Sequence, residues 1–354
     1  MRPPRFEDRL GLKTQNMTRP KNTVTFAQAS EQLRSNASLK PAWLRGFNDL
    51  ADADLAAFQT QWDGFSSERR IALTTALLDL AANDIELNFN NIFRLALNDA
   101  DANVRRNAID GLGEEENAAL INPLIDLLKS DPAEPVRAAA ARALGRFALL
   151  SELERLKKER HTQIYKALLT HFRAAPEDSL VYRNALESLS YISNDTVAMY
   201  IRAAFASEDP DTRRSAIIAM GRSQDRRFAE FVREELQAVH PATRLAAVEA
   251  AGELEDEGAV NDLKSLFDDS DRKVQLATLN ALAQIGSADA KTILQQAVLS
   301  PDEEFAKAAG EALEMYDFWH GEIDFSITNF DEEDLKPRRV WKQRDTSGES
   351  DVSV

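Results

Sequence analysis

Apolar and polar positions repeat in one frame along most of the chain. The frame is clearest in residues 210–221, PDTRRSAIIAMG, where Ala216 serves as its anchor. The same frame returns at a spacing of 31 residues at Ala185, Ala247, Thr278 and Ala309, and more loosely at Ala72, Ala108 and Ala140. A fixed period of about 30 residues is typical of a solenoid, in which every unit packs on its two neighbours.

Each unit predicts a pair of helices. The first helix has apolar residues three or four positions apart, which is the spacing of one helix face, as in Val260, Leu263, Leu266 and Phe267. A turn rich in Asp and Pro follows, and the second helix is the repeated frame itself. The interval from Ala140 to Ala185 is longer, 45 residues, and residues 149–160 (LLSELERLKKER) predict an extra or lengthened helix there.

Residues that occupy the same position in the second helix of successive units, here called a column, share a physical role that explains the frame. Positions four before and four after the anchor are mostly apolar, so with the anchor they predict a buried stripe where helices approach closely. An Asp seven before the anchor is placed to cap the helix. An Arg three before the anchor is placed to pair with that Asp or with the Asp of the neighbouring repeat. The column residues are Arg105, Arg137, Arg213 and Arg244, and Asp101, Asp178, Asp209, Asp271 and Asp302.

Glycines follow the stripe in several units. Because glycine suits the left-handed conformation that ends many helices, we expect these residues to be C-caps. They are Gly113, Gly145, Gly221 and Gly252.

The pattern divides the chain into four segments. Residues 1–22 carry six basic and two acidic side chains, which predicts a flexible basic tail, and the sequence leaves open whether Met1 or Met17 is the natural start. Residues 23–64 predict a helical N-terminal cap, which a solenoid needs at its exposed end. The repeats span residues 65–316. Residues 317–354 predict an acidic and polar C-terminal tail, whose aromatic residues either fold back on the last repeat or form a short recognition motif.

This repeated sequence pattern of Asp, Val-Arg, Ala and Leu-Gly resembles HEAT repeats. The resemblance is to the short form found in the phycobilisome-lyase-like HEAT family and in bacterial HEAT-repeat proteins. The resemblance covers about residues 65–315. It implies an all-α fold, a right-handed α-solenoid of the armadillo/HEAT type with about seven to eight helix pairs and a helical N-terminal cap. It also implies a protein-binding scaffold, with Asp and Arg columns that are structural rather than catalytic.

Composition narrows the class of protein. The net charge of −16, from 59 acidic and 43 basic residues, disfavours nucleic acid as a partner, because phosphate binding needs a basic face. The chain has no cysteine, which excludes disulfides and fits a reducing compartment. No apolar run approaches the roughly 20 residues that span a bilayer, and no signal peptide is visible. We therefore expect a cytoplasmic protein without a membrane partner.

The sequence contains few residues in patterns that are typical of catalysis or of metal or cofactor binding. Deoxyhypusine hydroxylases resemble this architecture and hold two irons with His-Glu pairs, but none of the four histidines is followed by Glu: His161, His171, His240 and His320. HEAT-type bilin lyases are a second enzymatic relative, and they offer no local motif to test. No phosphate-binding glycine loop and no hydrolase motif is present. We expect no enzymatic activity, no metal and no cofactor, with a HEAT-type enzyme or lyase accessory as the alternative.

A partner surface is expected on the second helices, which usually line the concave face of HEAT solenoids. The column two after the anchor is rich in acids. We predict that this acidic row contacts a basic or helical protein partner, and an ordinary solvated helix face is the other interpretation. The row consists of Asp110, Glu187, Glu249, Asn280 and Glu311.

One basic cluster interrupts the acidic surface, and it is a candidate site for a phosphate or an acidic peptide. Three of its arginines fit equally well as ladder and turn residues. The cluster consists of Arg213, Arg214, Arg222, Arg226 and Arg227. The sequence therefore favours a non-enzymatic scaffold or adaptor, and it leaves the partner's identity, the pathway and the oligomeric state open.

Overall fold

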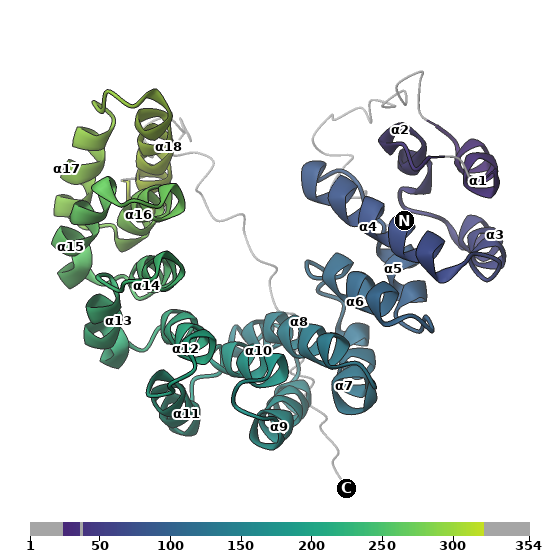
Figure 1. The fold of residues 1–354 in the computed structure, drawn as a ribbon, viewed down its shortest axis with the longest axis horizontal. Helices are drawn as coiled ribbons and strands as arrows, with labels where there is room; N and C mark the ends of the chain where they lie inside the picture. The colour runs from purple at the N-terminus through teal and green to yellow at the C-terminus, as the bar shows by residue number, and fades with distance from the viewer. Residues whose placement is uncertain (1–23, 36–37, 322–354) are drawn as a thin grey trace, which may run out of the picture.

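The computed structural model describes residues 24–35 and 38–321, which form an open arc of stacked helices (Figure 1). The helices of the repeated frame lie side by side along the inner, concave side of the arc, each in contact with the next. These inner helices are α4 (Ser67–Asn83), α6 (Ala102–Gly111), α8 (Glu134–Glu152), α10 (Leu180–Leu189), α12 (Pro210–Arg222), α14 (Pro241–Glu253), α16 (Arg272–Ile285) and α18 (Glu303–His320).

A second row of helices covers the outer, convex side (Figure 1). Each outer helix packs against the inner helix that follows it in the chain. These outer helices are α5 (Asn90–Ala96), α7 (Ile121–Ser130), α9 (Lys158–Ala174), α11 (Asp195–Phe205), α13 (Ala229–Glu235), α15 (Val260–Ser265) and α17 (Ala288–Ala297). The result is an all-α solenoid whose described part contains no strand, as the sequence predicted.

The N-terminal end is closed by α1 (Phe26–Arg34), α2 (Pro41–Leu44) and α3 (Asp52–Trp62). Their core is aromatic, with the ring centroids of Phe47 and Phe58 5.4 Å apart and those of Phe58 and Trp62 5.8 Å apart. The indole N–H of Trp62 donates to Asp99 at 3.0 Å, which ties these helices to the turn before α6. The cap predicted for residues 23–64 remains a prediction.

The anchor column is the centre of the helix stack. Every anchor from Ala108 to Ala309 has no exposed surface, and this includes Thr278, whose hydroxyl donates to the carbonyl of Val274 at 2.8 Å. Small side chains at this position let each inner helix lie close to its partners, because a larger one would have no free volume to occupy. The predicted stripe is therefore buried along most of its length, and Thr243 and Leu313 are its half-buried members.

Arginine–acid pairs join inner helices to the repeat that follows, and together they form an arginine–acid ladder. In each pair an arginine of one inner helix reaches an acid in the next repeat. The pairs are Arg70–Asp99, Arg105–Asp131, Arg183–Asp209, Arg213–Glu235, Arg244–Asp269 and Arg272–Asp302. The sequence predicted that the column arginines pair with a column Asp of the same or the neighbouring repeat. They reach the neighbouring repeat, but the partners of Arg105, Arg213 and Arg244 are Asp131, Glu235 and Asp269, which lie outside that column.

The N-caps are mostly the predicted aspartates. Asp101, Asp209, Asp271 and Asp302 each accept a hydrogen bond from a backbone N–H in the first turn of their helix. Asp178 does not cap α10, because Ser179 accepts the bond from the N–H of Tyr182 instead. The acids that pair with Arg105 and Arg244 lie two residues before the N-cap position, in the turn itself.

The prediction that the glycines are left-handed C-caps is wrong. Among the described glycines only Gly286 has a positive φ, and the turns after α12 and α14 instead use Gln224 and Glu255, at φ 52° and 50°. Gly221 and Gly252 lie inside their helices, facing the next inner helix. A Cβ atom on Gly221 would come within 2.7 Å of the Cα of Ala250, so glycine here permits close helix packing.

The long interval in the repeat comes from two lengthened helices. Helix α8 has 19 residues and α9 has 17, and they are joined by a short turn, so residues 149–160 add length rather than an extra helix. At the other end, α18 continues to His320, beyond the point where the repeat pattern stops. The basic tail at 1–22 and most of the predicted C-terminal tail lie outside the described residues.

Candidate partner-binding surface

The predicted acidic row lies on the inner helices, but its first two members are engaged within the protein. Asp110 accepts a hydrogen bond from Arg142 of α8 at 2.5 Å. Glu187 accepts from the hydroxyl of Ser215 at 2.7 Å and from Arg222 at 3.0 Å, both on α12. These carboxylates therefore join neighbouring inner helices and carry little free charge toward a partner.

The free acids of the concave face gather farther along the arc. Glu249 and Glu253 lie one turn apart on α14, and neither forms a hydrogen bond or ion pair with another side chain of the described residues. They line a hollow of about 230 Å³ between α14 and α16. The other lining residues are Ala277, Asn280, Ala281 and Gln284.

The row therefore contributes Glu249 and Asn280 to one surface. Glu311 lies exposed on α18, where Lys307 is 3.6 Å away and offsets its charge. Glu253 was missed by the sequence argument, which stopped at one column. Extending that column by one helical turn, from position two to position six after Ala247, would have found it.

The protein surroundings of these two glutamates favour their neutral forms. Burial raises the pKa of Glu253, and the opposing effect of Arg222 only reduces this shift, while the neighbouring charge of Glu249 adds to it. Burial likewise raises the pKa of Glu249. Both residues are exposed at the surface, so a cationic ligand can reach the two carboxylates and offset the repulsion between them.

Replacing Glu253 by Gln is expected to raise the free energy of unfolding at pH 7. A raised carboxyl pKa means that the folded state binds the proton more tightly, so the wild type loses stability as pH rises through the raised value. The advantage of the variant should shrink as pH is lowered toward the ordinary glutamate pKa of about 4.3. Urea unfolding at neutral and acidic pH measures this.

The matched control is Glu234→Gln, because Glu234 is an exposed acid on the outer helix α13. An equal pH dependence of the two variants would show that Glu253 is not destabilised by its surroundings.

The predicted basic cluster is dispersed and accompanied by acids. Arg213 pairs with Glu235 and Arg214 with Asp211, both at the start of α12. Arg222, at the far end of the same helix, pairs with Glu187. Arg226 and Arg227 lie in the turn after α12. Arg226 pairs with Glu255, and Arg227 pairs with Asp195 and Asp225. The structure brings these five arginines to two separate ends of α12.

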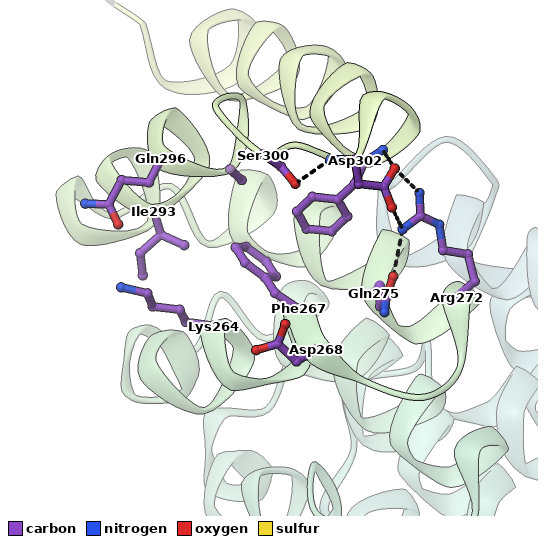
Figure 2. Close-up of a pocket in the computed structure, with 11 residues that line it drawn as sticks. Lys264, Phe267, Asp268, Arg272, Gln275, Ile293, Gln296, Ser300 and Asp302 are labelled. Atoms are coloured by element: carbon purple, nitrogen blue, oxygen red, sulfur yellow. Dashed lines mark hydrogen bonds and ion pairs between the residues drawn. The ribbon is translucent and has the colours of Figure 1, made fainter.

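Another hollow lies near the C-terminal end of the solenoid, and Figure 2 shows it. It measures about 460 Å³ and is lined by residues of α15 to α18. Phe267 and Phe305 form its apolar wall, with ring centroids 5.1 Å apart. Its arginine, Arg272, is bound to Asp302 at 2.9 Å, so the charge of this guanidinium is already matched.

The four histidines lie apart on the solenoid. His171 and His320 contact backbone carbonyls, of Ala167 at 2.8 Å and Ala283 at 3.0 Å. His161 lies 3.1 Å from the hydroxyl of Ser151, and His240 precedes α14. Within residues 24–35 and 38–321, no group of three or more His, Cys, Asp or Glu side chains is arranged to hold a metal ion.

Comparison with known proteins agrees with the helix pairs. The model of HEAT repeats matches residues 91–163 and 229–314. The chain therefore contains HEAT repeats, and its fold is an α-solenoid, which is consistent with a protein-interaction scaffold. No curated protein matches the sequence.

Solved structures of similar shape include three of natural proteins. The complex of CpcE and CpcF of phycocyanin lyase from Nostoc shares 16% identity, over 64% of this chain and 94% of that chain, with a TM-score of 0.43. YibA of Escherichia coli shares 16%, over 78% and 97%, with a TM-score of 0.43. Human deoxyhypusine hydroxylase shares 18%, over 72% and 92%, with a TM-score of 0.33. These identities are too low to transfer an activity.

None of the helices in the described residues is both long enough and apolar enough to cross a membrane.

Proposed function

We propose that this protein is a non-enzymatic scaffold, and that the concave face between α14 and α16 binds a basic segment of a protein partner. The observation that carries the proposal is the pair Glu249 and Glu253, two carboxylates that face the concave side without a hydrogen bond or ion pair to another described side chain. Elsewhere on the inner helices, Asp110 and Glu187 are bound by arginines of the protein itself.

The shape and chemistry of the surrounding surface support a partner that is extended or helical. Ala277 and Ala281 keep the hollow shallow, so that a backbone or helix can approach, and Asn280 and Gln284 offer amide groups beside the carboxylates. Lysine and arginine side chains suit this pattern, because opposite charge at an interface gives both faster association and orientation. A protein partner also agrees with the general role of HEAT solenoids.

Reversing both charges, in Glu249→Lys/Glu253→Lys, is expected to weaken partner capture about tenfold or more. Loss of two charge-assisted contacts, and the repulsion that replaces them, exceeds the roughly 1.4 kcal/mol that a factor of ten requires. The measurement is capture from the lysate of cells that make the protein, quantified by mass spectrometry against the wild type. The lost partner is then purified and its affinity measured at two salt concentrations.

The matched control is Glu230→Lys/Glu234→Lys. These two exposed glutamates are also one turn apart, but on the outer helix α13. The proposal predicts that the control keeps the partners that the concave variant loses. If both variants retain the same partners at equal abundance, the concave face is not the binding surface.

A further inference from the structure

One junction of the arginine–acid ladder has an arginine without an acid. Arg137 of α8 stands three before its anchor, the same position as Arg105 in α6. Arg105 Nη1 donates to the carbonyls of Asp99 and Ala100 at 2.8 and 2.9 Å. Arg137 Nη1 donates in the same way to the carbonyls of its own turn, at 2.8 and 3.1 Å. Its guanidinium is therefore held in a fixed orientation.

The opposite edge of the guanidinium differs between the repeats. Nε and Nη2 of Arg105 donate to Asp131 at 2.7 and 2.8 Å. The same two atoms of Arg244 donate to Asp269 at 2.6 and 2.7 Å. Nε and Nη2 of Arg137 donate to none of the described residues, and no ion pair in the described part of the chain joins α8 to α10. This repeat therefore keeps the Nε and Nη2 edge of Arg137, here called the fork, in a fixed orientation. It lacks the carboxylate that binds the same edge of Arg105 and Arg244.

The fork lies at a hollow of about 300 Å³ between α8, α9 and α10. Two further polar groups line this hollow. The hydroxyl of Ser179 accepts from the N–H of Tyr182 at 3.2 Å, which leaves its own proton to donate. His171 donates to the carbonyl of Ala167 through Nδ1, so Nε2 of the neutral ring is an acceptor and can donate to a carboxylate only when the ring is protonated. The rest of the lining is mostly apolar: Ala174, Ala175, Pro176 and Val181.

The hollow near the C-terminal end of the solenoid also holds an arginine, Arg272, which stands six rather than three positions before its anchor, Thr278. In Figure 2, both terminal nitrogens of Arg272 bind Asp302, at 2.9 and 3.1 Å. Asp302 is the N-cap residue of α18, whereas the N-cap residue of α10 is Ser179. A hydroxyl at this position caps the helix but supplies no negative charge to an arginine.

We propose that the hollow between α8, α9 and α10 is a binding site for a carboxylate group, held by the Nε and Nη2 edge of Arg137. The carboxylate takes the place that Asp131 takes on Arg105 and Asp269 takes on Arg244. Planar bidentate pairing with arginine selects a carboxylate of this geometry, and the apolar lining accepts a short aliphatic stem behind it. The acid belongs either to a small molecule or to an acidic side chain of a peptide.

The acids of the protein near this site include Glu134 and two residues of the turn before α10, Glu177 and Asp178. Glu134 also lines the hollow, and its Oε1 accepts from the N–H of Leu180 at 3.0 Å, at the start of α10. Its charge opposes a bound carboxylate. Glu177, in the turn before Ser179, is exposed, and its side chain forms no hydrogen bond or ion pair with Arg137.

The test uses the ring signals of the four histidines in the full-length wild-type protein. Sodium propionate and the peptide acetyl-Ala-Glu-Ala-amide are titrated in, with propionamide and the corresponding Gln peptide as neutral counterparts. The expected result is a saturable shift of the His171 signal with the acids only, while the signals of His161, His240 and His320 stay in place. Signals are assigned from single His→Gln variants.

The two acids distinguish the sources of the carboxylate. Tenfold tighter binding of the Glu peptide than of propionate assigns the site to acidic peptide side chains, and equal binding assigns it to small carboxylates. Equal shifts with the acids and their neutral counterparts, or parallel shifts of all four histidines, would overturn the proposal.

Variants test the role of the fork. Arg137→Gln should abolish the His171 shift, and Arg137→Lys, which keeps the charge but loses the fork, should weaken binding at least tenfold. Arg106→Gln is the matched control, because Arg106 is exposed on α6 and the change in net charge is the same. Glu134→Gln keeps the acceptor for Leu180 and should tighten binding severalfold. Unchanged binding in both Arg137 variants contradicts the site.

Discussion

Replacing Arg105 by Met is expected to lower the free energy of unfolding by about 3–5 kcal/mol, because it leaves a buried carboxylate without its partner. The side chain of Asp131 is only 3% exposed and that of Arg105 10% exposed. The variant keeps most of the aliphatic volume of arginine, so the loss reports the missing charge and hydrogen bonds rather than a cavity. Urea unfolding at pH 7 measures it.

The same pair gives a pH dependence of known sign. Burial raises the pKa of Asp131, but the hydrogen bonds from Arg105 and from the N–H of Ala133 outweigh burial, so this pKa lies below its ordinary value. A lowered carboxyl pKa adds stability above the unfolded value of about 3.9, and this stability is lost as pH falls through the folded value. The wild type should therefore lose more stability in acid than a variant without the pair.

Two further variants separate pairing from burial. Arg142→Met breaks the pair with Asp110, in which the side chains are 58% and 31% exposed, and it should cost within about 1 kcal/mol. The double variant Arg105→Met/Asp131→Leu should recover most of the loss, because it removes the unpaired charge as well. Equal costs for Arg105→Met and Arg142→Met would show that the ladder does not depend on burial.

Replacing Gly221 by Ala is expected to destabilise the solenoid by about 1–3 kcal/mol relative to the same change at Gly310. The added Cβ on Gly221 would lie 2.7 Å from the Cα of Ala250, so helices α12 and α14 would have to move apart. Gly310 lies inside α18 with nothing within 4 Å of its Cβ position. Alanine there should stabilise by about 1 kcal/mol, through helix propensity alone.

Thermal or urea unfolding of both glycine variants provides the comparison. Because both glycines are inside helices, the propensity gain is common to the two and cancels in the difference. A stabilising effect of similar size at Gly221 and Gly310 would mean that close packing at Gly221 is not required.

Much of this fold follows from the sequence because the same physical task recurs in every unit. The anchors from Ala108 to Ala309 must be small to let inner helices meet, and that requirement is visible as a period. The glycines were misread because glycine serves two purposes, a left-handed turn and a close approach. Only the distance from Gly221 to the neighbouring helix decides between them, and a single sequence does not contain it.

The candidate surface was predictable only in part for a related reason. The column through Asp110, Glu187 and Glu249 is correctly placed on the inner helices. Whether each carboxylate is free depends on the long side chains of the next helix, such as Arg142 and Arg222, which reach across the stack. Sequence spacing gives the face on which an acid lies, but not the residues within reach of its carboxylate.

Contacts between neighbouring repeats have a kinetic consequence. The side-chain bonds that join them connect residues only 21 to 47 positions apart, from Arg94–Glu115 to Ser188–Ala141, in a chain of 354. Each such loop costs little entropy to close, and closing one does not require distant segments to find each other. Folding can then begin at any helix pair and spread in both directions, so the length of the chain need not slow it.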